Sequence, residues 1–165
     1  MHQTSEAGVK FLVGHLRWCL AQPLNGGSRE WAVSVSRAVN QLDEAFRRHV
    51  EVMESAGGPL EQVAEPGQLP FTSAAQQVRR LRREHATLHT EIQCVGELFR
   101  DCLLLFAPPP DPFPRSAATS GMAESRATRL FGMLGSRVED FLAELENHLA
   151  AERELQAALV SDVSG

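Results

Sequence analysis

The chain has 165 residues, of which 43% are hydrophobic and 22% charged, an ordinary balance for one globular domain. Its formal net charge of −5 excludes the basic excess that is typical of nucleic-acid-binding domains. No stretch approaches the roughly 20 continuous apolar residues of a membrane span. The opening MHQTSEAGVK also lacks the basic and apolar regions of a signal peptide. We therefore expect one cytoplasmic domain over residues 1–165, with neither a membrane nor a nucleic acid as partner.

The spacing of apolar residues and the breaks between them predict four helices, at about residues 7–22, 28–55, 73–106 and 122–159. Gly57 and Gly58 end the second helix, and a loop is expected from Pro59 to about Thr72. No segment alternates apolar and polar residues with the period of a strand. The expected fold is therefore all-α, an antiparallel up-down four-helix bundle.

Five of the six histidines fall on the apolar stripes of these helices, which would face the core of a bundle. They are His15, His49, His85, His89 and His148. A single histidine on such a stripe is more often a core residue that finds a hydrogen-bond partner than a metal ligand. Five in one core would exceed the polar partners that the stripes supply, and a bound metal ion removes this difficulty. The pattern therefore favours a shared metal site.

A carboxylate joins the stripe of the fourth helix, where Glu152 follows His148 by one turn. A buried carboxylate costs several kcal/mol unless it is paired, so the two side chains can hold one ion together. The alternative is a solvated carboxylate near the end of the helix. The three cysteines form no C-x-x-C motif, and imidazole with carboxylate suits iron, manganese or zinc.

The order of these residues resembles the hemerythrin family, also called the HHE cation-binding family, over most of the chain. The resemblance rests on His15 and on three strings, FRRHVEVMESAGGPLEQV, RREHATLHTEI and ENHLAAERE. Carried over residue by residue, it implies the metal ligands His15, His49, Glu54, His85, His89, His148 and Glu152. The chain departs from the family in its second helix, where Met53 stands at the position of the usual carboxylate and Glu54 follows.

The resemblance implies a centre of two non-haem irons, bridged by carboxylates, at which O₂, NO or peroxide binds for sensing, carriage or scavenging. One iron is expected instead if Met53 disables the bridge. Glu54 lies five residues from His49, which turns it about 140° away, so it needs a long reach or a local distortion. No residue reads as a general base or nucleophile, and we expect no enzyme activity. Signalling would require a protein partner.

Two other classes of protein stay open. The first is a mononuclear metal-dependent enzyme similar to the DinB family, which holds one divalent ion with three histidines. The second is a metal-free helical interaction module, in which the histidines are core or pH-sensitive groups. Metal stoichiometry distinguishes the first from a di-iron protein, and the effect of a chelator on thermal stability distinguishes the second.

Overall fold

The computed structural model describes residues 2–22, 28–64, 73–105 and 117–163. Its four long helices are α1 (His2–Ala21), α2 (Ser28–Glu54), α4 (Ser73–Leu105) and α5 (Ala117–Val163), and the short helix α3 (Pro59–Ala64) follows α2. No strand occurs in these four ranges. The prediction of an all-α fold is confirmed for the described part of the chain.

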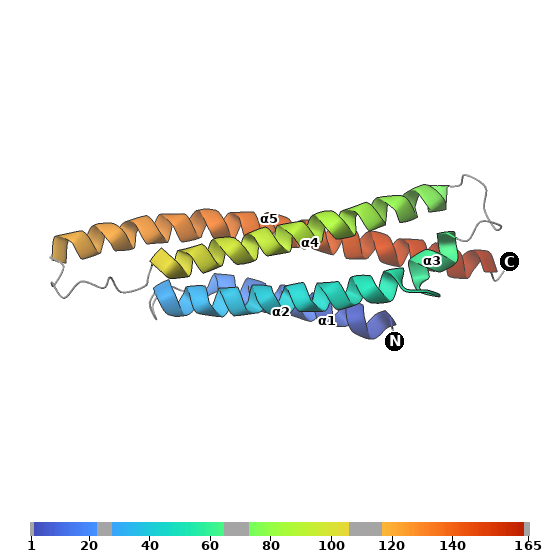
Figure 1. The fold of residues 1–165 in the computed structure, drawn as a ribbon, viewed down its shortest axis with the longest axis horizontal. Coiled ribbons are helices and arrows are strands. Elements are labelled where there is room, and N and C mark those ends of the chain that lie inside the picture. Colours follow the sequence, from blue (N-terminus) through green and yellow to red (C-terminus); the bar gives the residue numbers. More distant parts are fainter. Residues whose placement is uncertain (1, 23–27, 65–72, 106–116, 164–165) are drawn as a thin grey trace.

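The long helices lie lengthwise beside one another, and successive ones run in opposite directions along the longest axis (Figure 1). Helix α2 packs against α1 on one side and α4 on the other, and α5 contacts both α4 and α1. These contacts form a closed ring of four helices, which is compatible with the expected bundle. The ring encloses a space that only side chains can fill.

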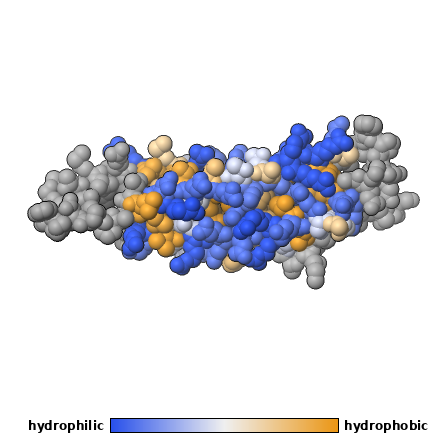
Figure 2. All heavy atoms as spheres, in the orientation of Figure 1, coloured by the Kyte–Doolittle hydropathy of each residue, from blue (hydrophilic) through white to orange (hydrophobic). Residues whose placement is uncertain are grey.

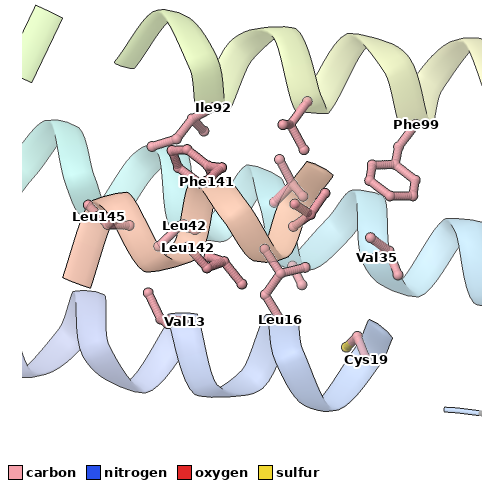
Figure 3. Packing of buried hydrophobic residues seen from close by; sticks show 14 of the residues in the cluster. Val13, Leu16, Cys19, Val35, Leu42, Ile92, Phe99, Phe141, Leu142 and Leu145 are labelled. Atoms are coloured by element: carbon pink, nitrogen blue, oxygen red, sulfur yellow. The ribbon is translucent and has the colours of Figure 1, made fainter. Parts of the chain in front are cut away.

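The main hydrophobic core takes side chains from all four long helices. Figure 3 shows them converging between the ribbons, among them Val13, Leu16, Val35, Leu42, Ile92, Phe99, Phe141 and Leu145. Burying one such side chain stabilises the fold by about 1.5–3 kcal/mol. The steps of three and four between these residues therefore determine which face of each helix turns inward.

A second, smaller core lies beyond the first and consists of Met53, Leu60, Val78, Leu81 and Leu155. Helices α2, α4 and α5 contribute to both cores. On each of these three helices, the stretch between the two cores carries buried polar side chains, which are described below. The apolar interior is thus divided by a polar layer.

The expected loop from residue 59 was wrong at its start, because residues 59–64 form helix α3. Pro59 occupies the first helical position, where a missing N–H costs nothing. The carboxylate of Glu61 accepts a hydrogen bond from the backbone N–H of Gly57 at 2.6 Å. Leu60 is buried in the second core, and this packing gives the short helix a reason to form. The rest of the expected loop, residues 65–72, lies outside the described residues.

Two long helices also start earlier than expected, α1 at His2 and α5 at Ala117, and α5 extends to Val163. Helix ends are poorly specified by apolar spacing, because the first and last turns contribute few core residues. The visible surface is mostly hydrophilic, with hydrophobic residues in scattered patches (Figure 2). None of the described helices combines the length and apolar composition needed to cross a bilayer.

The turn after α2 depends on two glycines. Gly57 has a φ of 73°, in the left-handed region that other residues avoid. A Cβ on Gly58 would lie 2.7 Å from the carbonyl oxygen of Val52 and 2.8 Å from that of Ser55. Both contacts are with backbone, so a side chain at residue 58 would force the turn to move.

We expect Gly58→Ala to lower the free energy of unfolding by about 1–3 kcal/mol, because the added methyl group overpacks the turn. Gly14→Ala is the matched control, since nothing lies within 4 Å of a Cβ at this exposed helical position. That change should raise the free energy by about 0.5–1 kcal/mol. Urea denaturation followed by circular dichroism measures both. Equal effects would mean that the turn accommodates a side chain without strain.

Candidate metal centre

The polar layer consists of three histidines and one glutamate, His49 on α2, His85 on α4, and His148 and Glu152 on α5. None of the four is more than 4% exposed. His148 and Glu152 are one turn apart on α5, so they share a face. His49 lies between Phe46 of the main core and Met53 of the second core, and His85 lies similarly between Leu88 and Leu81. The apolar stripes therefore bring the polar groups to one level.

The three imidazoles present their Nε2 atoms to the carboxylate of Glu152. His49 Nε2 lies 2.7 Å from Oε2, and His85 Nε2 lies 2.8 Å from Oε1. His148 Nε2 is 3.4 Å from Oε1 and has no hydrogen-bond partner. One carboxylate thus faces three ring nitrogens from three different helices.

The opposite ring nitrogen of each histidine has a partner of its own. His49 Nδ1 lies 3.0 Å from the hydroxyl of Ser5, and His85 Nδ1 lies 2.7 Å from Glu54 Oε1. His148 Nδ1 lies 2.9 Å from Glu84 Oε2. The Nδ1 side of every ring is therefore occupied, and the Nε2 side is the one that faces the interior.

These contacts shift the pKa values of the acidic and basic groups. Burial disfavours the charged form of Glu152, but the contacts of His148, His49 and His85 outweigh it and hold its pKa well below the ordinary value. Burial also opposes charge on His148, yet Glu152 and Glu84 raise its pKa overall. The pKa of Glu84 is lowered, because His148 and Arg80 together outweigh its desolvation. The layer therefore holds Glu152 as a carboxylate.

The two carboxylate contacts of His85 explain why a cation fits in the polar layer. Both of its ring nitrogens lie within hydrogen-bond distance of carboxylate oxygens, so both bonds form only when both nitrogens carry a proton. A metal ion can replace the proton on Nε2, while Nδ1 continues to donate to Glu54. The same replacement would give the unpartnered Nε2 of His148 a partner. The donor set therefore suits a metal ion.

The ligand atoms of His49, His85 and Glu152 lie within 4.8 Å of one another, so this buried group could hold an ion. His148 contacts the same carboxylate and is a candidate fourth ligand. The ring of Phe46 lies against all three imidazoles, with centroid distances of 6.2 Å to His49, 6.0 Å to His85 and 6.4 Å to His148. An aromatic wall therefore closes the layer on the side of the main core.

Two of the histidines expected at the site lie elsewhere. His15 is partly exposed, stacks on Trp18 and lies 3.8 Å from Cys19 Sγ. Since Ser5 is the residue of α1 that reaches the polar layer, His15 lies ten residues, or about 15 Å, further along the helix. His15 therefore does not join the polar layer in this structure, and its role as a metal ligand stays a prediction.

The imidazole of His89 is 35% exposed and lies 3.3 Å from Asp43 Oδ1. It lies one turn, about 6 Å, further along α4 than His85, and its contact is with Asp43 of α2. His89 therefore also lies outside the polar layer in this structure, and its role as a metal ligand stays a prediction. Glu54 does reach the layer, but its contact is with the outer nitrogen of His85.

Two residues at the layer escaped the sequence analysis, Ser5 and Glu84. Both lie off the apolar stripes, and each contacts a histidine of another helix. The sequence does not show that Ser5 and Glu84 contact these histidines. Each contact depends on how two neighbouring helices align, and the spacing of residues within one helix does not record this. A polar residue adjacent to a candidate ligand, as Glu84 is to His85, is the only hint that the sequence offers.

The contacts of Glu152 predict a large effect in metal-free protein. We expect Glu152→Gln to lower the free energy of unfolding by about 1–3 kcal/mol in the presence of a chelator, because buried imidazoles lose a charged acceptor. Glu146→Gln on the same helix is the control, since it removes an exposed ion pair with Arg17 that contributes about 1 kcal/mol at most. Urea denaturation compares them. A loss no larger than that of the control would contradict the stabilising role of Glu152.

Comparison of the chain with protein-family models, with curated proteins and with solved structures finds no match in any of the three. The resemblance to the hemerythrin family therefore stays a prediction from the sequence. The geometry of the polar layer is the structural observation that favours a metal centre.

Proposed function

We propose that this protein is a metal-binding antiparallel up-down four-helix bundle that holds one transition-metal ion with His49, His85, His148 and Glu152. One observation carries the proposal. Three imidazole Nε2 atoms from three helices face one buried carboxylate, while each Nδ1 is held by a separate partner. Metal-binding histidines need this arrangement, in which one nitrogen is directed at the ion and the other is held by a partner.

The energetics of the core support binding over a metal-free role. Leucine at each of these four positions would continue the apolar stripes and join the two cores. Buried ionic groups are often less stabilising than apolar residues of similar volume. A polar layer that divides a core thus calls for a function, and a bound ion would turn four costly groups into ligands.

Iron is the ion that we propose, on the strength of the resemblance to the hemerythrin family. Imidazole and carboxylate without thiolate also suit manganese and zinc, so the donor set agrees with iron without selecting it. One ion is proposed in place of two, because His15 and His89 lie away from the layer. Met53, which stands where the family places a carboxylate, is buried in the second core and offers none.

The bound iron would supply an open coordination position for a small ligand such as O₂ or NO. The chain's own residues would exclude water, through Phe46 on one side and Leu81 on the other. A pocket of about 310 Å³ lies next to Leu81, lined by Gln76, Gln77, Arg80, Leu81 and Ala151. Ala151 adjoins Glu152 in the chain, so this pocket lies near the layer, but none of the four proposed ligands lines it. Sensing, carriage or scavenging of a small oxidant is the proposed role.

A mononuclear metal-dependent enzyme is the second candidate, and the convergence of three histidines on one site favours it over a di-iron protein. It requires a group that acts on a substrate. In the described residues, the carboxylates nearest the layer, Glu54 and Glu84, are engaged with histidines. We therefore place this candidate below a ligand-binding role.

Metal binding should be measurable directly. Protein loaded anaerobically with Fe²⁺ should retain about one iron per chain, and saturation at 100 times the dissociation constant should add about 2.7 kcal/mol to the free energy of unfolding. A chelator should reverse the gain. His85→Ala should abolish both effects, whereas His15→Ala should leave both unchanged because His15 lies outside the layer.

Elemental analysis and thermal melting provide the two readouts. Two irons per chain, one of them lost in His15→Ala, would restore the full ligand set of the hemerythrin family. Retention of zinc with no change in spectrum on exposure to air would favour the second candidate. No binding of any of these metals would leave a metal-free helical module.

A further inference from the structure

At Nδ1, each of the three histidines contacts a residue of another helix, and we call these the outer contacts. They follow the order of the helices. Ser5 of α1 contacts His49 of α2, Glu54 of α2 contacts His85 of α4, and Glu84 of α4 contacts His148 of α5. Each of the first three long helices thus supplies the residue that contacts the histidine of the next long helix. The fourth, α5, supplies Glu152, which all three histidines face.

We infer that Glu54 and Glu84 are positioning residues of the metal site and that neither is a metal ligand. This inference rests on the proposed function, because it concerns the same four ligands. A carboxylate that accepts the Nδ1 proton fixes the tautomer and orientation of the ring and makes Nε2 a stronger donor. Ser5 fixes orientation through a neutral hydroxyl, and its effect should be the smallest of the three.

The position of Glu54 favours a positioning residue over a metal ligand. Its Oε1 lies 2.7 Å from His85 Nδ1, while Nε2 of the same ring faces Glu152. The imidazole ring therefore stands between Glu54 and the interior of the layer. The five-residue step from His49 to Glu54 turns the side chain by about 140°, away from the direction of His49 and toward the neighbouring helix. The five-residue spacing, in which this chain differs from the family, thus places Glu54 in contact with His85 of α4.

Glu84 is held from both ends. Its Oε2 lies 2.9 Å from His148 Nδ1, and its Oε1 accepts a hydrogen bond from Arg80 Nε at 2.6 Å. Arg80 lies one turn before Glu84 and is largely exposed, at 74%. Both carboxylate oxygens of Glu84 therefore have a partner, Arg80 at one and His148 at the other. The partly exposed network thus leads from the surface to His148.

The test is a titration of metal-free protein with Co²⁺, whose visible absorption reports the ligands around the ion. Glu54→Ala and Glu84→Ala should each weaken binding about 10–100-fold while the stoichiometry stays at one ion per chain. Glu54→Gln and Glu84→Gln should weaken it less, since the amide oxygen still accepts the Nδ1 proton. Glu51→Gln is the control, because it removes an exposed charge from the same end of α2.

The outcomes separate the two proposals. If Glu54 is a ligand, Glu54→Gln and Glu54→Ala should change the absorption bands alike, and this would overturn the inference while leaving the metal site intact. Affinities within two-fold of the Glu51→Gln control would also overturn it. Failure of the wild-type protein to bind Co²⁺ or Fe²⁺ would instead overturn the metal site itself. If an alanine variant does not fold, the glutamine variant at the same residue still tests the inference, because its affinity for Co²⁺ can be compared with that of Glu51→Gln.

Discussion

The buried carboxylate of Glu152 is the group on which the interior of this protein depends. It lies in a layer between two apolar cores, and three imidazoles from three helices face it at 2.7, 2.8 and 3.4 Å. A carboxylate in such surroundings is stable only while these partners stay in place. Any sliding or rotation of α2, α4 or α5 would remove one of them. The same group that a metal ion would bind therefore also restricts how the helices align.

The layer joins all four long helices, although only three of them supply its histidines. Helix α1 takes part through Ser5, which reaches His49 near the start of the chain. The contacts at Nδ1 surround those at Nε2, so that His49 and His85 are held at both ring nitrogens and His148 is held at Nδ1. This arrangement provides the rigidity that metal ligands require, because an imidazole with one free side could rotate away from the ion. A site in the core of a bundle obtains this support from neighbouring helices, which a surface loop could not provide.

The second helix shows how a single position changes the chemistry of a site. Met53 and Glu54 are adjacent, yet their side chains diverge by about 100° around the helix axis. Met53 packs into the second core, and Glu54 turns outward to His85. A carboxylate at residue 53 would have faced the interior beside His49. Met53 instead packs an apolar side chain beneath the layer, which agrees with the proposal of one ion.

The amino-acid sequence alone determined the helical class, the approximate extent of the long helices and the inward positions of His49, His85, His148 and Glu152. Residues that follow one another in steps of three and four lie on the same face of a helix, whichever other helices pack against it. Tertiary structure decided which of the inward residues meet. His15 and His89 keep the same rhythm, but the level of a residue along its helix depends on how the helices are aligned, and rhythm carries no information about alignment. The contacts of Ser5, Glu54 and Glu84 likewise arise only between helices, so spacing within one helix could not reveal them.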